Sequence, residues 1–150
     1  MKKLLILALA ISAFSLSANA QSRALGIRGA YGIEASYQCT TFGDNFLEAD
    51  LGWYPGSIAA AVCHDFVWDI SSIFNLYAGP GANVHLFSTR DNNDKSFTAI
   101  GAGVGVQLGV ELEIPFAPIN ISIDWRPMWN FIGPDTFMLK SAALGIRYRF

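Results

Sequence analysis

The stretch from Ile100 to Ile114 alternates between two kinds of side chain with a period of two. Its even-numbered positions are all aliphatic, and its odd-numbered positions carry glycine, glutamine or glutamate. Successive side chains of a β-strand point to opposite faces, whereas a helix would repeat its apolar positions every three or four residues. The stretch therefore predicts a long strand with one apolar face and one face of small or polar residues.

The same alternation recurs in shorter stretches along the chain, separated by segments rich in glycine, proline, serine and asparagine. Residues 24–39 fit either one unbroken strand or two, and the glycines between Gly29 and Gly32 suit a tight turn, which favours two. We predict strands near residues 23–30, 32–39, 45–54, 58–69, 74–87, 98–113, 118–130 and 139–150.

Two architectures share this pattern. A soluble barrel or sandwich buries the apolar face, and a membrane barrel turns it outward to lipid and keeps the polar face in the lumen. Charged residues make up 15% of the chain and hydrophobic ones 52%, whereas a soluble domain has about 25% charged residues. The net charge of −2 argues against a nucleic-acid partner, which needs a basic face.

The first twenty residues have the three parts of a secretory signal. Lys2 and Lys3 precede an uncharged run from Leu4 to Leu16, and the small residues of Ala18–Ala20 follow. The run is shorter than the ~20 residues a membrane-spanning helix needs. We therefore predict a cleaved signal peptide over residues 1–20 and a single domain over residues 21–150.

Aromatic residues lie mostly near the ends of the predicted strands, where membrane barrels place their aromatic girdles. The candidate girdle residues are Trp53, Trp68, Trp125 and Trp129. The chain also finishes on an alternating strand, Gly145–Phe150, with an aromatic final residue.

This ending resembles the C-terminal signal of Gram-negative outer-membrane β-barrels. The body resembles small single-domain barrels of the OmpA-type, porin-like superfamily. The matching stretches are Gly26–Gly29, Leu76–Ala82, Ile119–Pro127 and Leu144–Phe150. The resemblance implies a location in the bacterial outer membrane, contact with outer-membrane lipids, and recognition of Tyr148 and Phe150 by the barrel assembly machinery. It implies no chemistry.

Length sets the number of strands. Eight membrane strands of about 9–11 residues use about 72–88 residues, and sixteen would use about 144–176. Residues 21–150 therefore predict an eight-stranded antiparallel transmembrane β-barrel. Residues 88–96 and 131–138 are predicted extracellular loops, and Ser71–Ser72 and Pro115–Pro118 are predicted periplasmic turns.

The predicted lumen face carries most of the charge. An eight-stranded barrel is just wide enough to be filled by side chains, so these charges predict a network that closes the lumen. A narrow ion path is the alternative. The acids are Glu34, Glu48, Asp50, Asp65, Asp69, Glu111, Glu113 and Asp124, and the bases are Arg28, Arg126, Arg147 and Arg149.

No catalytic, metal or cofactor site is predicted. Small outer-membrane enzymes such as lipid A deacylases pair a serine with a histidine, but His85 and Ser88 have opposite parity and should point to different faces. Cys39 and Cys63 likewise belong to opposite faces, which argues against a disulfide.

The function predicted from the sequence is a structural or surface-interaction role without a defined reaction, and the extracellular partner is left open. A lipid-modifying enzyme of the lipid A deacylase type is one alternative. A secreted, soluble, lipocalin-like barrel that binds an apolar ligand is the other.

Overall fold

A computed structural model describes residues 23–90, 96–133 and 136–150, and the regular structure in these residues is β-strand. The predicted signal peptide at residues 1–20 lies outside the described residues. The strands are β1 (Arg23–Gly29), β2 (Ile33–Thr40), β3 (Phe46–Tyr54), β4 (Ser57–Ser71), β5 (Phe74–Arg90), β6 (Ser96–Glu113), β7 (Ile119–Trp125), β8 (Met128–Ile132), β9 (Phe137–Met138) and β10 (Ala142–Arg149).

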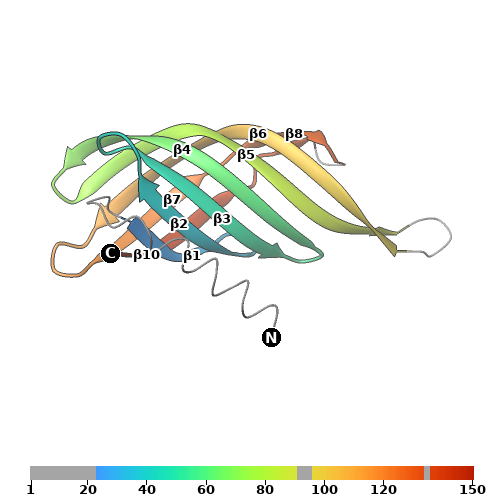
Figure 1. Cartoon of the computed structure of the whole chain (residues 1–150), viewed down its shortest axis with the longest axis horizontal. Coiled ribbons are helices and arrows are strands. Elements are labelled where there is room, and N and C mark those ends of the chain that lie inside the picture. Colours follow the sequence, from blue (N-terminus) through green and yellow to red (C-terminus); the bar gives the residue numbers. More distant parts are fainter. Residues whose placement is uncertain (1–22, 91–95, 134–135) are drawn as a thin grey trace.

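The strands form a closed antiparallel ring (Figure 1). Neighbours in the chain pair in order from β1 to β6, and the pairing of β10 with β1 closes the ring. β7 and β8 pair one after the other with β6, and β9 lies beside β8 ahead of β10. Because β7 and β8 together form one strand of the wall, and β9 and β10 form another, the ten segments make eight wall strands. This confirms the predicted eight-stranded antiparallel barrel.

The structure shows whether residues 24–39 form one strand or two, and it corrects the predicted bounds of the last two strands. Residues 24–39 are two strands, joined by a turn in which the Ala30 amide donates to the Gly32 carbonyl. The strand predicted at 118–130 is interrupted between β7 and β8, because Pro127 has no amide hydrogen for the ladder. The strand predicted at 139–150 begins only at Ala142, and part of the predicted 131–138 loop is strand.

The two ends of the barrel differ. The C-terminal end carries residue 150 and the turns at 41–45, 72–73 and 114–118. The opposite end, called the loop end, carries the turns at 30–32 and 55–56 and the far ends of β5, β6 and β8. β5 and β6 stay paired as far as Arg90 and Ser96, so the predicted 88–96 loop is shorter than expected. This hairpin projects beyond the other strands, whereas β1 and β2 have only 7 and 8 residues (Figure 1).

The turn between β3 and β4 shows how local sequence sets the register. Pro55 and Gly56 join Tyr54 to its ladder partner Ser57, and Gly56 has a φ of 80°. A type II turn prefers proline followed by a glycine with positive φ. In the resulting register, Glu48 and Asp50 on the polar face of β3 are buried in the barrel.

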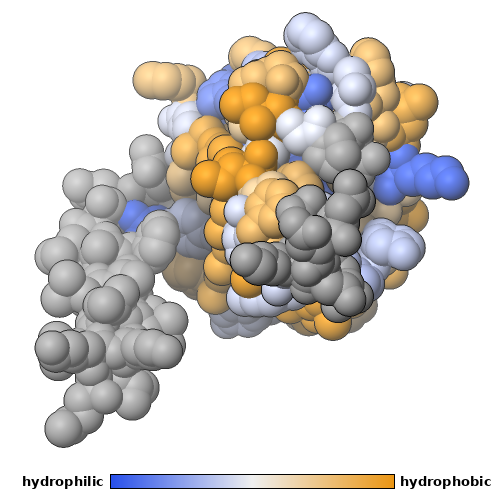
Figure 2. All heavy atoms as spheres, turned by 90° about the vertical axis from the view of Figure 1, so that its right-hand side faces the viewer, coloured by the Kyte–Doolittle hydropathy of each residue, from blue (hydrophilic) through white to orange (hydrophobic). Residues whose placement is uncertain are grey.

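The barrel is polar inside and apolar outside. Among the described residues, 15 polar or charged side chains are buried, against 6 hydrophobic ones. The outward strand positions carry exposed Leu, Ile, Val, Phe and Trp side chains, and a view of the loop end shows hydrophobic residues around much of the rim (Figure 2). Residues that a soluble protein buries are here on the surface.

No helix of the described residues has the length and the apolar content needed to cross a bilayer.

Candidate functional site: a charged layer between two cavities

Glu48 of β3 is the centre of the interior. Its side chain is fully buried and accepts hydrogen bonds from Arg126 at 2.9 Å, Arg147 at 2.9 Å and Gln38 at 2.8 Å. Gln107 of β6 donates a fourth at 3.3 Å. Because these donors come from different walls, one carboxylate links opposite sides of the barrel.

Arg28 of β1 forms a second cluster and is paired with four acids, of which Glu48 lies 3.6 Å from its Nε. Its guanidinium pairs with Glu34 of β2 and Asp124 of β7, and its Nη1 lies 3.4 Å from Asp50 of β3. The Tyr54 hydroxyl donates to Glu34. Arg126 also contacts Asp50, so this cluster is continuous with the one around Glu48.

Arg147 of β10 is held by uncharged groups as well as by Glu48. Its Nε donates to the Ser36 hydroxyl at 2.9 Å, and its Nη1 donates to the Ser122 hydroxyl at 2.8 Å. Glu111 lies 3.8 Å from Nη1. A buried guanidinium needs hydrogen-bond partners, and each of the three nitrogens of Arg147 has one.

The charged layer also depends on a glycine. Tyr77 of β5 is buried, and its hydroxyl donates to Asp124 at 3.2 Å. Its ring lies against Gly109 of β6, where an added Cβ would overlap the ring atoms. The glycines on the lumen face of β6 are thus matched to large side chains across the ladder.

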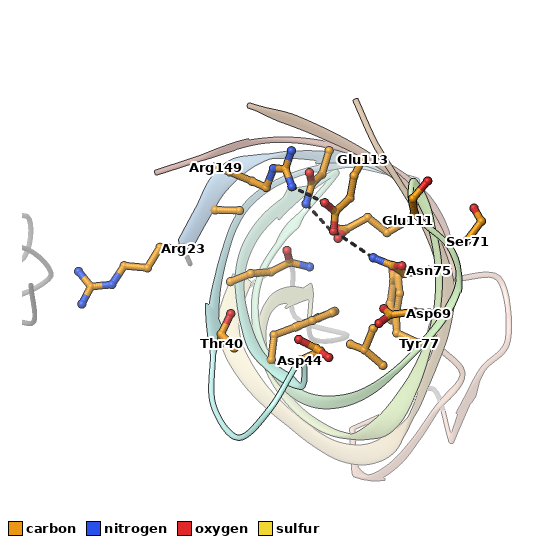
Figure 3. Close-up of a pocket in the computed structure, with 16 residues that line it drawn as sticks. Arg23, Thr40, Asp44, Asp69, Ser71, Asn75, Tyr77, Glu111, Glu113 and Arg149 are labelled. Atoms are coloured by element: carbon orange, nitrogen blue, oxygen red, sulfur yellow. Dashed lines mark hydrogen bonds and ion pairs between the residues drawn. The ribbon is translucent and has the colours of Figure 1, made fainter. Parts of the chain in front are cut away.

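The layer divides the interior into two cavities that share no lining residue. The lower cavity, at the C-terminal end, has a volume of about 490 Å³ and a polar lining (Figure 3). The upper cavity, at the loop end, has a volume of about 670 Å³, and Phe87, Met128 and Met138 lie in its walls.

The predicted lumen charges fall into three groups. Nine are buried: Arg28, Glu34, Glu48, Asp50, Asp65, Glu111, Asp124, Arg126 and Arg147. Glu113 and Arg149 form a separate, part-exposed pair at the rim of the lower cavity (Figure 3). Asp69 differs from its prediction, because it is exposed at that rim and makes no ion pair among the described residues.

Asp65 is buried beside the network without joining it. Both of its carboxylate oxygens lack a hydrogen-bond partner among the described residues. The nine buried charges include six carboxylates and three guanidinium groups. The interior therefore has more acids than the guanidinium groups can neutralise.

Sequence reasoning missed the uncharged half of the network. Ser36, Gln38, Gln107, Ser122 and Tyr77 satisfy donors and acceptors that the charged residues leave open. For the two serines and two glutamines, parity on the predicted strands is the signal that would have found them, because each shares a face with a predicted lumen charge on its own strand. The predicted strand at 74–87 has no charged residue, so Tyr77 carried no such signal.

The four predicted girdle tryptophans all point outward and are half exposed. Trp53 is next to the turn at the loop end of β3, and Trp68 is near the opposite end of β4. Trp125 differs from a girdle position, since it lies midway along the interrupted β7–β8 wall and donates to the Leu139 carbonyl at 2.7 Å. Tyr148 and Phe150 are exposed at the C-terminal end.

The described residues contain no assembled catalytic or metal site. His85 points into the upper cavity, and the exposed Ser88 has the opposite parity on β5. Cys39 and Cys63 are both free thiols. No group of three or more His, Cys, Asp or Glu side chains in the described ranges is placed to hold a metal ion.

No family model and no curated protein sequence matches the chain. Solved structures do match its fold. Neisserial surface protein A (NspA) aligns with a TM-score of 0.58 at 16% identity, over 87% of this chain and 94% of NspA.

Ail, the attachment invasion locus protein of Yersinia pestis, solved in complex with the heparin analogue sucrose octasulfate, aligns with a TM-score of 0.55 at 14% identity, over 87% of this chain and 95% of Ail. Another structure of Ail, an outer membrane protein in a phospholipid bilayer nanodisc, has a TM-score of 0.45 at 17% identity, over 87% of this chain and 98% of that one. The predicted resemblance to small outer-membrane barrels is confirmed at the level of the fold.

Proposed function

We propose that this protein is an integral β-barrel of the bacterial outer membrane, with a closed interior and a structural or surface-interaction role. The observation that carries the proposal is the inverted polarity of the barrel, in which charged side chains fill the lumen and aliphatic ones cover the outside. A membrane barrel has this arrangement because its outer face meets hydrocarbon.

Three further observations support the outer-membrane location. Residues 1–20 have the pattern of an export signal. Trp53 and Trp68 lie on the outer face near opposite ends of the barrel. Ail, whose fold is similar, is an outer membrane protein. Outer-membrane lipids are then the immediate partners, and the assembly machinery is the partner that the Gly145–Phe150 strand would meet during insertion.

Fractionation tests the location against the soluble, lipocalin-like alternative. We expect the protein in the outer-membrane fraction, extracted only by detergent, with a gel mobility that changes on boiling. A lipocalin-like barrel needs an apolar interior, opposite to the polar interior seen here. Recovery in a detergent-free periplasmic or culture fraction would exclude the proposal.

Planar-bilayer conductance tests the closed interior. Hydrogen bonds from opposite walls meet on Glu48, so we expect the unaltered protein to show no single-channel steps. The double variant Arg126→Ala, Arg147→Ala removes two of the side chains that cross the lumen, and we expect it to conduct. The outward-facing change Val106→Ala is the matched control and should stay silent. Regular conductance steps from the unaltered protein would contradict a closed lumen.

A reaction is absent from the proposal because the serine–histidine pair of a lipid A deacylase is not assembled, since His85 and Ser88 lie on opposite faces of β5. A lipid A deacylase assay of the purified protein, with His85→Ala for comparison, tests this point. We expect no acyl release from either. Release that His85→Ala abolishes would replace the proposal with the enzyme alternative.

A further inference from the structure

The upper cavity has the size and the lining of a small-molecule site. Its volume of about 670 Å³ is within the range typical of ligand pockets, about 300–1,000 Å³. Phe87, Met128 and Met138 form apolar walls, and Asp50 and Arg126 form part of a charged floor. Apolar walls with a few convergent polar groups are typical of sites that bind small amphiphilic ligands.

Three polar atoms at this cavity have no hydrogen-bond partner among the described residues. They are Oδ1 of Asp50, Oδ1 of Asn83 and Nδ1 of His85, all of them buried. The Asp50 side chain is 2% exposed and uses only Oδ2 in its contacts with Arg28 and Arg126. Buried polar atoms are normally satisfied, so three open ones in one cavity point to a bound polar group.

His85 is held in place rather than free to turn away. Its ring packs against Phe87 with centroids 5.5 Å apart. It also covers Gly101, where an added Cβ would overlap the imidazole. Gly101 leaves room for the ring, whose Nε2 side faces that wall, and His85 lines the cavity two residues from Asn83 on β5.

The charge of the floor selects the sign of the ligand. Arg28 and Arg126 are already paired with carboxylates, so the open groups at the floor are acceptors. The buried carboxylates of the barrel also outnumber the guanidinium groups by six to three. An ammonium group would supply hydrogen-bond donors and positive charge together.

The cavity also has an open side at the loop end. The β1–β10 ladder stops at Gly29 and Leu144, while the cavity lining continues past it to Tyr31 on one side and Met138 on the other. Lys140 lies at this opening and is exposed, so its own ammonium group does not occupy the floor of the cavity. A ligand can therefore place its polar head on the floor and its apolar part toward the opening.

We propose that the upper cavity binds a small amphiphile with a primary ammonium head and an apolar body, with the head on Asp50 and Asn83 and the body against Phe87, Met128 and Met138. This inference goes beyond the structural role proposed above. It requires only a folded barrel and holds whether or not the lumen conducts.

Calorimetry on the purified protein in nanodiscs of zwitterionic lipid tests the proposal, with n-hexylammonium as the probe and empty nanodiscs as the blank. We expect saturable binding at one site. Hexanoate and hexanol should bind at least about tenfold more weakly, because each lacks the charge-assisted donors. No saturable binding, or equal binding of all three probes, would overturn the proposal.

Variants locate the site. Ala59→Phe fills the cavity beside His85 and should abolish binding, and Asn83→Ala should weaken it about 2–10-fold through one lost hydrogen bond. The matched control is Asn75→Ala, on the same face of β5 but in the lower cavity. Heat-dependent gel mobility confirms that each variant is folded. Weaker binding in Asn75→Ala with none lost in Asn83→Ala would place the amine elsewhere and refute the proposal.

Discussion

Arg147 and Arg149 lie two residues apart on the same face of β10, and each is paired with a glutamate of another strand. The Arg147–Glu48 pair is in the charged layer, and both of its side chains are 0% exposed. The Arg149–Glu113 pair is at the rim, where its side chains are 30% and 33% exposed. The two regions therefore contain the same chemistry at different depths.

Depth changes what each pair depends on. At the rim, water solvates either partner when the other is absent, and among the described residues the only other side-chain hydrogen bond to the Glu113 carboxylate comes from Asn75 at 3.0 Å. In the layer, Glu48 is shared among Arg126, Arg147 and two amides, so its loss leaves several buried donors without an acceptor. The charged layer is thus a cooperative unit, and the rim pair is a local contact.

The largest expected effect is that of Glu48→Ala. Removing one partner of a buried ion pair costs about 3–5 kcal/mol, because the remaining charge is buried and unpaired. We expect the free energy of unfolding, from urea titration followed by tryptophan fluorescence, to fall by about that amount. A loss below about 1 kcal/mol, the range of exposed pairs, would remove the distinction between layer and rim.

Gly109→Ala tests whether the layer is packed as tightly as it is hydrogen-bonded. The new Cβ would overlap the Tyr77 ring and displace its hydroxyl from Asp124, so we expect a loss of about 1–3 kcal/mol in the same titration. Gly29→Ala is the matched control, because its Cβ would meet only the Leu144 carbonyl oxygen at 4.0 Å. Equal effects of the two substitutions would show that the Tyr77 ring has room to move.

The comparison also shows how far sequence reasoning reaches. Period-two alternation predicted the strands and the two faces of β6, because side-chain direction in a strand depends only on parity, and chain length then predicted eight of them. It did not separate Asp69 from Asp65, which share the lumen face of β4 four residues apart. One is exposed at the rim and the other is fully buried.

Whether a position is odd or even along a strand tells which face its side chain is on, but not how far that side chain lies from the end of the barrel. Depth depends on how far each strand is staggered against its neighbours, and pairings such as Phe46 with Asp65 become visible only when the ladder is known. The break at Pro127 illustrates the same limit. A proline in an alternating stretch signals a lost ladder hydrogen bond. That β8 pairs again with β6 after the break depends on how these two strands are staggered, which the sequence does not show.

The smallest expected effect is that of Glu113→Ala. The pair it removes is about one-third exposed, and exposed pairs contribute about 0–1 kcal/mol. We expect the change in unfolding free energy to stay below about 1 kcal/mol at low ionic strength, and to shrink as the ionic strength is raised, because salt screens exposed charges. Glu48→Ala should keep most of its effect under the same conditions, since its pair is shielded from solvent. A rim effect that matched that of Glu48→Ala and persisted in salt would mean that Glu113 and Arg149 belong to the charged layer, and that burial does not separate the two regions.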